Sequence, residues 1–401
     1  MEALMAWKEI KVETQRKYFI QAYNEGKFKM AELCRQFDIC RPTGYTWVKR
    51  HKLEGDKGLK NRSSAPHHQA GATDPSIERQ ILEVKFEWKK WGPKKVHGHL
   101  IKTEPSINWP SATTIGKIFD KNGLTVSRKY RKRYASKTDP LSHANGSNDV
   151  WSIDFKGWFL TRDGHKCDPL TLTDNFSRFL LRCVKLNCND GDHVWAILDT
   201  AFREYGLPYY LRSDNGPPFA TKGAGRLSAL SIKLIKAGVI PEWIDPGNPQ
   251  QNGRHERMHG TLAQEAVFPE LNLEEQLMKF PIFQQYYNFI RPHETLGQVT
   301  PGSIYKPSLR IWNGRLQSPE YSNEYKIGKV KSCGKMYWKG HEIYIGRAFE
   351  GEPLGLKETE EGLLAVYYGP IVLGTLTKEY ELDIPRRQGR KRRKIKTIKN
   401  V

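Results

Sequence analysis

The sequence of 401 residues lacks any apolar run of membrane-spanning length and any charged-then-apolar signal peptide at its N-terminus. It also lacks an internal repeat, a glycine-rich loop for phosphates, and a serine or cysteine nucleophile with a recognisable partner base. These absences predict a cytoplasmic protein with no membrane partner, and they disfavour serine or tyrosine recombinase chemistry. The length suggests roughly two to four domains.

Cysteine is sparse. None of the six cysteines belongs to a CxxC pair, and none has histidine partners at the spacing of a zinc site. The cysteines are therefore predicted to be reduced structural thiols, and no structural zinc is expected.

Acidic residues are fewer than basic ones, 44 against 65, which gives a net charge of +21. The excess is uneven: the net charge is +13 in residues 1–150, −1 in 151–300 and +9 in 301–401. Lysine and arginine clusters neutralise phosphates and release counterions. The two basic flanks therefore favour a nucleic-acid partner over a merely soluble basic surface.

Residues 9–62 show the apolar spacing of several short helices, the last of them predicted from about Pro42 to Lys52. This outline is typical of a helix-turn-helix, whose second helix enters the major groove of DNA, and we assign it to residues 1–65. Four side chains of that helix are candidates for contacts with bases or phosphates: Thr43, Thr46, Lys49 and Arg50. Three others are expected to supply core contacts: Tyr45, Trp47 and Val48. The alternative is a structural helical bundle.

Residues 61–73 are rich in small residues, proline and histidine, which predicts a linker. A second helical, helix-turn-helix-like unit is predicted within residues 73–137, where Asp74 precedes the first helix and Ser111 is the N-cap of the last. The unit ends in SRKYRKRYASK (127–137), which interleaves basic and aromatic residues. We expect this segment to track DNA, the alternative being a solvated linker.

From Val150 onward, strands and then alternating helices and strands predict a mixed α/β domain over residues 145–310. Short apolar segments broken by glycine predict a small β-barrel of four or five strands over residues 322–385. Residues 386–401 are a basic tail too dense in like charge to fold alone. The predicted fold class is thus multidomain α/β, with N-terminal all-α domains and a small C-terminal barrel.

Three acidic residues stand out by their context in the α/β domain. Asp154 lies within a predicted strand, on the face opposite Ile153 and Phe155, where an unpaired carboxylate is costly unless it has a function. Asp214 follows a strand in RSDNGPPFA, at the end where open α/β sheets bind their ligands. Glu256 lies just inside a helix and points away from that helix's apolar stripe of Met258, Leu262 and Ala266.

Three carboxylates that converge in this way suit Mg²⁺ or Mn²⁺, because these ions prefer oxygen ligands. Two such ions can activate an attacking water or 3′-hydroxyl and stabilise the leaving oxygen of an in-line displacement. Taken singly, Asp214 could instead stabilise a turn, and Glu256 could be an ordinary acid of the first helical turn.

The segments around these acids, WSIDFKG, RSDNGPPF and NPQQNGRHERMHGTL, resemble the signature blocks of the DDE transposases of bacterial insertion sequences, in the retroviral-integrase superfamily. A fourth block, YYNFIRPHETLGQVTPGSIY (286–305), resembles the helix and loop that follow the catalytic residues in that family. The resemblance covers about residues 10–305 well and the C-terminal region loosely.

The resemblance implies an RNase H-like core with a mixed five-stranded sheet, in which Asp154, Asp214 and Glu256 are catalytic residues and ligands of two Mg²⁺ or Mn²⁺ ions. It implies N-terminal domains that bind the terminal inverted repeats of the element, and a homo-oligomer that brings two DNA ends together. The partners would be double-stranded element ends and target DNA, and the place of action the cytoplasm, in association with the nucleoid.

Other residues of the core are assigned on weaker grounds. Asn215 and Gly216 are expected to shape the loop of Asp214, and Asn252 and Gly253 the start of the Glu256 helix. DNA contacts near the active site are predicted for three residues that could equally be solvated: Arg254, Arg257 and His259. A further acid, Asp174, is interpreted as a hairpin residue.

One feature departs from the family pattern. The 41 residues between Asp214 and Glu256 exceed its most frequent spacing, and the surplus is placed in 221–231. Two other functions remain open: a catalytically silent DNA-binding regulator derived from a transposase, and a simple RNase H-like nuclease.

Overall fold

The computed structural model describes residues 12–62, 72–125, 144–245, 248–266 and 269–384. Contacts divide the chain into two units, residues 1–72 and 73–401, and each is described by itself. The two basic segments predicted at 127–137 and 386–401 lie outside the described residues. In the part of the chain that is described, no helix has the length and apolar character needed to cross a membrane.

The first unit is a bundle of three helices, α1 (Val12–Asn24), α2 (Met30–Gln36) and α3 (Arg41–Glu54), closed by a 3-10 turn (Gly55–Leu59). The predicted helix from about Pro42 is confirmed as α3, with Cys40 as its N-cap. Val48 is buried in the bundle core, as expected, but Tyr45 is 57% exposed. The predicted core role of Tyr45 is therefore wrong, because α3 turns Gly44 and Val48 toward the core and Tyr45 lies on the next face.

Gly44 marks the closest approach between α3 and the rest of the bundle. A β-carbon there would lie 2.7 Å from the Cys34 sulfur, 3.1 Å from the Phe19 ring and 3.2 Å from the Met30 sulfur. A glycine inside a helix costs about 1 kcal/mol against alanine, so this position gives up helix propensity in exchange for close packing.

Gly44→Val is therefore expected to destabilise the first unit by about 2 kcal/mol or more, because the added methyl groups would overlap with side chains that already fill the core. Thermal unfolding followed by far-ultraviolet circular dichroism measures the change. Tyr45→Ala, one residue away and exposed, serves as the control and should shift stability by less than about 0.5 kcal/mol. Equal effects of the two changes would contradict the packing described here.

The second unit begins with α4 (Pro75–Glu87), α5 (Pro93–Thr103) and α6 (Ala112–Lys121). The predicted cap is confirmed, because the Ser111 side chain accepts a backbone N–H group at the start of α6. Asp74, predicted to precede the first helix, caps α4 in the same way. These helices dock on the α/β domain through aromatic contacts. Trp91 Nε1 donates to the Tyr286 hydroxyl at 2.6 Å, and Trp88 stacks on the Tyr286 ring with centroids 4.7 Å apart.

The α/β domain is built on a five-stranded sheet in the order β5-β4-β1-β6-β7. Its strands are β1 (Val150–Phe155), β4 (Pro169–Asp174), β5 (Leu180–Lys185), β6 (Tyr210–Ser213) and β7 (Ile240–Trp243). The first three pair antiparallel, whereas β6 and β7 run parallel to β1. The predicted mixed five-stranded sheet is thus confirmed. A small hairpin, β2 (Phe159–Leu160) and β3 (Lys166–Cys167), follows β1.

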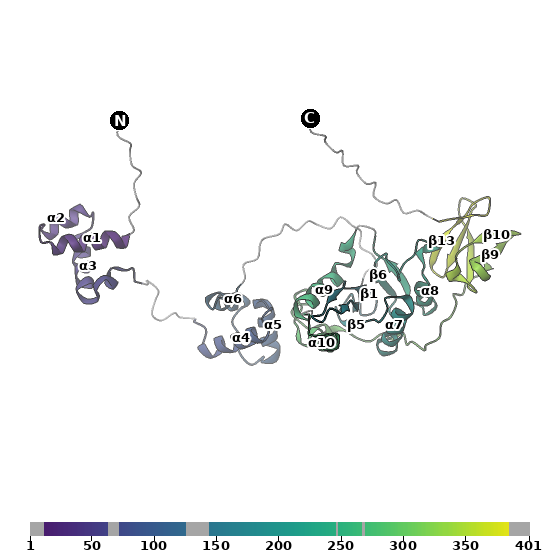
Figure 1. Cartoon of the computed structure of the whole chain (residues 1–401), viewed down its shortest axis with the longest axis horizontal. Helices are drawn as coiled ribbons and strands as arrows, with labels where there is room; N and C mark the ends of the chain where they lie inside the picture. Colours follow the sequence, from purple (N-terminus) through teal and green to yellow (C-terminus); the bar gives the residue numbers. More distant parts are fainter. Residues whose placement is uncertain (1–11, 63–71, 126–143, 246–247, 267–268, 385–401) are drawn as a thin grey trace, which may run out of the picture. The chain divides into compact units, whose positions relative to one another are not determined.

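Helices cover both faces of this sheet (Figure 1). Trp151 and Ile153 of β1 pack with α7 (Gly191–Tyr205) and α8 (Ala229–Lys236) in one hydrophobic core. On the other face, Leu180 and Cys183 of β5 pack with α9 (Gly253–Glu265) and α10 (Leu273–Gln285). A π-helical turn (Tyr286–Ile290), a 3-10 turn (Glu294–Leu296) and α11 (Pro301–Ile304) complete the domain.

The C-terminal region forms an open sheet in the order β14-β13-β12-β11-β8 with a separate hairpin, β9 (Lys335–Trp338) and β10 (His341–Tyr344). The strands of the sheet are β8 (Lys326–Lys329), β11 (Pro353–Glu358), β12 (Leu364–Tyr368), β13 (Ile371–Leu376) and β14 (Leu382–Asp383). The predicted strands are present, but no pairing among the described residues joins β14 to β8. Closure into a barrel is therefore not confirmed.

The surplus segment between Asp214 and Glu256 has a structural role. It contains a 3-10 turn (Ala224–Arg226), and Ala224 and Leu227 share a hydrophobic cluster with the C-terminal sheet. Lys236 at the end of α8 adds an ion pair of 2.6 Å with Glu352. The C-terminal sheet thus packs partly on α8 and this segment, and less of its apolar face is left to close on itself.

Candidate active site

Two of the three predicted acids lie at the ends of neighbouring parallel strands. Strands β1 and β6 pair with Ser152 opposite Arg212, so the same register brings Asp154 beside Asp214 just past the end of β6. Adjacent strands lie about 4.8 Å apart. The sheet itself therefore places these two carboxylates side by side.

The surroundings of Asp154 disfavour its charge. Burial raises the pKa of its carboxyl to about 7, and the negative charges of Asp214 and then Glu256 add to the increase. A weaker contribution comes from Asp168, an acid that our sequence analysis did not single out. The electrostatic influence of Asp214 and Glu256 shows that the three predicted acids face a common region.

Helix α9 carries Glu256 on its exposed side and packs its opposite side against the domain. The predicted apolar stripe is confirmed, because Met258, Leu262 and Ala266 are all buried. Two histidines, His255 and His259, fix the helix to the sheet. The sequence analysis missed the first of these and assigned the second to DNA.

Both histidine rings bond to Thr171, the residue opposite Asp154 in the β1–β4 pairing. The Nε2 atoms of His255 and His259 each lie 2.7 Å from the Thr171 hydroxyl, and His255 Nδ1 lies 2.7 Å from the Thr173 hydroxyl. The Thr171 hydroxyl donates to the Asp154 carbonyl at 3.1 Å, so it accepts from both rings, and His255 Nδ1 accepts from Thr173. This network holds the helix of Glu256 against the strand that pairs with β1.

His259 is buried enough for its protonation to matter. Burial lowers its pKa to about 4 from 6.5, and the charge of Lys156 contributes. The unfolded chain therefore binds a proton at His259 more readily than the folded protein does. As the pH falls from the unfolded pKa of 6.5 toward the folded pKa of about 4, protonation of the unfolded chain lowers the stability of the folded state.

We therefore expect the stability of the wild-type protein relative to His259→Gln to fall by roughly 2–3 kcal/mol between about pH 7 and pH 4, since one pKa unit corresponds to about 1.4 kcal/mol. Glutamine can still donate to Thr171 but does not titrate. Denaturant unfolding of both proteins across this range measures the difference. A difference independent of pH would show that His259 is not held in its neutral form.

The loop after β6 positions Asp214 through its own residues. Asn215 Nδ2 donates to the Ile244 carbonyl at 2.7 Å, which ties the loop to the end of β7. The Gly216 N–H donates to the Asp214 carboxylate at 3.2 Å, and a β-carbon on Gly216 would lie 3.1 Å from that carboxylate. The predicted role of both residues in shaping the loop is confirmed.

The residues proposed for DNA contacts near the site differ in their surroundings. Arg254 and Arg257 have exposed side chains on the first turns of α9, and Arg254 donates to the Asn175 carbonyl at 3.0 Å. His259 instead has Thr171 as an internal partner. Its proposed DNA contact remains a prediction.

On α3, in the first unit, Lys49 is exposed. The Thr46 hydroxyl donates to the Pro42 carbonyl at 2.8 Å, and the Thr43 hydroxyl lies 3.0 Å from the Cys40 sulfur. The Arg50 guanidinium lies over the Trp47 ring. The DNA contacts of these four residues stay predictions.

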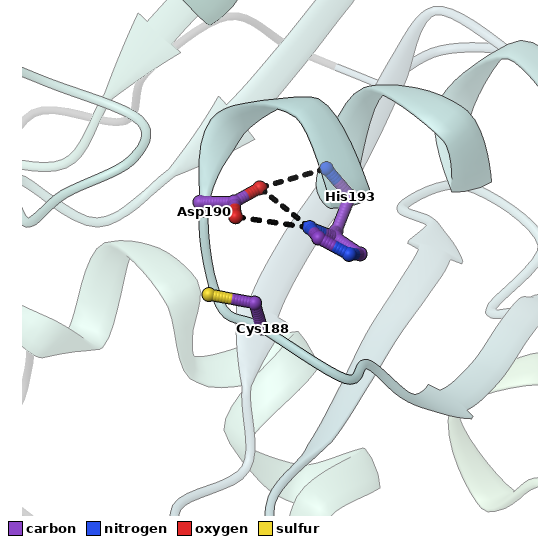
Figure 2. A group of neighbouring side chains, drawn as sticks. All are labelled: Cys188, Asp190 and His193. Carbon is purple, nitrogen blue, oxygen red and sulfur yellow. Dashed lines mark hydrogen bonds and ion pairs between the residues drawn. The ribbon is translucent and has the colours of Figure 1, made fainter.

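Another group of possible ligands lies at the start of α7. This group consists of Cys188, Asp190 and His193, whose possible ligand atoms all lie within 4.8 Å of one another (Figure 2). Among the described residues, no other three His, Cys, Asp or Glu side chains come this close together. The oxygens of Asp154, Asp214 and Glu256 do not all lie within that distance of one another.

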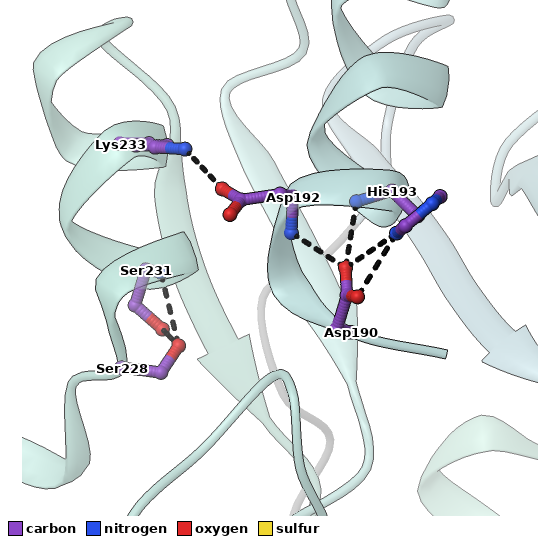
Figure 3. Close-up of polar contacts among 6 residues, drawn as sticks. All are labelled: Asp190, Asp192, His193, Ser228, Ser231 and Lys233. Atoms are coloured by element: carbon purple, nitrogen blue, oxygen red, sulfur yellow. Dashed lines mark hydrogen bonds and ion pairs between the residues drawn. The ribbon is translucent and has the colours of Figure 1, made fainter. Parts of the chain in front are cut away.

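The exposed group at α7 is explained by capping. Asp190 accepts the N–H groups of Asp192 and His193, and the His193 ring lies 2.8 Å from the same carboxylate (Figure 3). These hydrogen bonds hold the pKa of Asp190 well below its usual range, the His193 N–H contributing most. Asp192 then pairs with Lys233 at 2.7 Å and joins α7 to α8.

Comparisons with known families agree with this geometry. Residues 144–249 and 237–301 each match the integrase core domain. Residues 325–378 match the C-terminal domain of the IS481 family of transposases. Residues 15–67 match a helix-turn-helix domain, and residues 43–119 match a homeodomain-like domain.

Curated relatives come from insertion elements. The chain is 26% identical over 232 residues to the uncharacterized 39.2 kDa protein of insertion element IS476 of Xanthomonas euvesicatoria, an alignment that covers 57% of this chain and 64% of that protein. It is 27% identical over 231 residues to the uncharacterized 31.7 kDa protein of IS407 of Burkholderia multivorans, covering 57% and 80%. The chain therefore spans less than two thirds of the first of these relatives.

Among solved structures, the chain is similar to the HTLV-2 integrase catalytic core domain in complex with magnesium, with 15% identity, a TM-score of 0.33, and coverage of 41% of this chain and 100% of that one. The mixed sheet and the family matches define a protein with an integrase-type catalytic core. The family matches and the insertion-element relatives support an insertion-sequence transposase of the integrase superfamily.

Proposed function

We propose that this protein is a DNA transposase that binds the terminal inverted repeats of its element, cuts DNA strands at the element ends and joins the exposed 3′-hydroxyls to target DNA. The observation that carries the proposal is the placement of the acids. Asp154 and Asp214 are neighbours through strand register, and a histidine–threonine network holds the helix of Glu256 against the same sheet. RNase H-like chemistry at these residues is part of the proposal.

The donor set fits hard divalent cations. Asp154, Asp214 and Glu256 offer oxygen ligands alone, and none of them forms an ion pair with a described residue. Burial, and after it the charges of Asp214 and Glu256, raise the pKa of Asp154, and no cation among the described residues offsets them. Two bound Mg²⁺ or Mn²⁺ ions would supply activation of the attacking oxygen and stabilisation of the leaving oxygen.

The chain's own groups prepare the site. Asp154 would have to be deprotonated to serve as a ligand, and its raised pKa of about 7 means that it carries this charge mainly at higher pH. The Gly216 N–H orients the Asp214 carboxylate. His255 and His259 keep the first turns of α9, and with them Glu256, in a fixed position relative to β4.

DNA binding is assigned to the helical regions and the basic flanks. The exposed face of α3 carries Lys49 and Thr46, and the matched helix-turn-helix region contains this helix. We propose that α3 reads the inverted repeats, and that two or more copies of the chain bring two element ends together. The net charges of +13 and +9 in the terminal segments favour additional phosphate contacts.

The direct test is strand transfer with labelled duplexes taken from the DNA that flanks the gene. Joined products that require Mg²⁺ or Mn²⁺ and disappear with a chelator would support the proposal. Cut but unjoined DNA would favour a nuclease. DNA binding without cutting or joining at any metal concentration would favour a regulator that has lost catalysis.

A further inference from the structure

A cavity of about 940 Å³ opens beside Glu256, and four arginines are among the residues that line it. Arg254 and Arg257 reach it from the start of α9, Arg178 from the β4–β5 turn, and Arg291 from the segment after α10. Arg291 is already neutralised by Glu265 at 3.3 Å. The other three arginines form no ion pair with a described residue. Like charges gathered in this way repel one another unless an anion lies between them.

The turn that presents Arg178 is rigidly built. Asp174, fully buried, accepts the N–H of Asn148 at 2.8 Å and both the N–H and the hydroxyl of Ser177, at 2.7 and 2.6 Å. Its interpretation as a hairpin residue is thereby confirmed. Arg178 follows with φ of 67°, a left-handed conformation that costs a residue other than glycine about 1 kcal/mol. The turn holds an arginine in this strained position, directed toward the cavity.

Two residues of the cavity wall each contain a buried polar atom that has no partner among the described residues. These atoms are Nη1 of Arg178 and Nε2 of His293, a residue that is 7% exposed. Burial lowers the pKa of Arg178 to about 10, and the charge of Arg254 adds to the decrease. Buried polar groups are rarely left unsatisfied, so such atoms mark a place where a ligand completes the bonding.

We propose that this cavity binds a phosphodiester group of the DNA backbone, held by Arg178, Arg254 and Arg257. A phosphate would neutralise the three cations, satisfy the free N–H of Arg178 and meet the positive end of α9. Glu256 lines the same cavity and Asp154 and Asp214 do not, so the proposal places this phosphate on the cut strand but to one side of the scissile position. This inference rests on the proposed function and adds to it a pocket that fixes the position of the DNA strand relative to Glu256.

The test is the salt dependence of DNA binding. Fluorescence anisotropy measures the binding of a labelled duplex of the flanking DNA at several salt concentrations, with a chelator present. The proteins compared are wild type, Arg178→Gln and a control variant, Arg203→Gln. Arg203 lies on α7, is 57% exposed and pairs with Asp199, away from the cavity. Loss of one phosphate contact lowers the slope of log affinity against log salt by about 0.9. We expect this change in Arg178→Gln alone, and equal slopes in all three proteins would overturn the proposal.

Two further measurements separate ligand binding from a structural role. The thermal midpoint of Arg178→Gln without DNA should equal or exceed that of wild type, because an unpartnered buried cation is removed. Arg178→Lys should keep the wild-type slope, since it retains the charge. A midpoint several degrees lower in Arg178→Gln, with no recovery of the slope in Arg178→Lys, would mean that Arg178 only supports the turn.

A scan with single methylphosphonates along the cut strand locates the phosphate. At one position the neutral linkage should weaken DNA binding by wild type and leave DNA binding by Arg178→Gln unchanged. If no position behaves in this way, the proposed pocket is refuted. Because binding is measured without metal, this result is independent of catalysis. An inactive protein that shows the effect would uphold the pocket and reject the proposed strand transfer. A protein that joins DNA but shows no such effect would uphold strand transfer and reject the pocket.

Discussion

Asp154→Asn is expected to lower strand transfer by at least about a thousandfold while DNA binding stays close to that of wild type. Asparagine has the shape of aspartate but lacks the charge that would hold a divalent ion between Asp154 and Asp214. Several kcal/mol of transition-state stabilisation would be lost with that ion. The binding elements assigned to α3 and the basic flanks are far from this position in the chain and should be unaffected. Gel-resolved joining of labelled duplexes, with an anisotropy measurement of binding in parallel, gives both quantities.

Asp192→Asn is the matched control, because it makes the same change at a carboxylate that is 88% exposed and paired with Lys233. It should retain strand transfer within about twofold of wild type, as surface substitutions usually do. Joining by Asp154→Asn at a level similar to this control would remove Asp154 from the catalytic site.

Asp154→Asn should also make the metal-free protein more stable than wild type above pH 7. Folding raises the pKa of Asp154, so the folded state binds this proton more tightly than the unfolded chain does. Stability then falls as the pH rises from 3.8 to about 7, and an asparagine escapes that loss. A site that gains stability when its acid is removed is one that gives up stability for function.

The sequence predicted those features that depend on local periodicity. The four-residue steps of Met258, Leu262 and Ala266 predicted which side of α9 is buried, and alternation in β1 placed Asp154 opposite Ile153. Both patterns follow from the geometry of a single element. The position of Glu256 relative to Asp154 could be inferred only from the family resemblance, because it depends on how α9 packs on β4.

The residues that were misplaced or missed are those whose partners lie far away in sequence. His259 bonds to Thr171, 88 positions earlier, and nothing in its local pattern distinguishes this contact from solvation. Tyr45 is apolar enough for a core, yet Gly44 takes the buried position because α2 approaches closely. Arg178 became a candidate only when the turn of Asp174 and the cavity were seen together.

His255→Ala is expected to destabilise the catalytic domain by about 2–4 kcal/mol, lowering its thermal midpoint by roughly 5–12 °C. His255 is 1% exposed, and its ring bonds to the hydroxyls of Thr171 and Thr173. Alanine leaves the Thr173 hydroxyl without this partner and opens a cavity between α9 and β4. Since α9 also carries Glu256, strand transfer should fall even at temperatures where the variant is folded. Differential scanning calorimetry and the joining assay measure the two effects.

His193→Ala makes the same truncation at a half-exposed histidine of α7 and should cost less than about 1 kcal/mol, mostly from the lost contact with Asp190. If both variants lost the same stability, the buried network would have no special role. If His255→Ala were unstable but joined DNA at the wild-type rate when folded, α9 would keep Glu256 in place without the network. A loss of both properties in His255→Ala alone means that the contact which stabilises the domain also positions its third carboxylate.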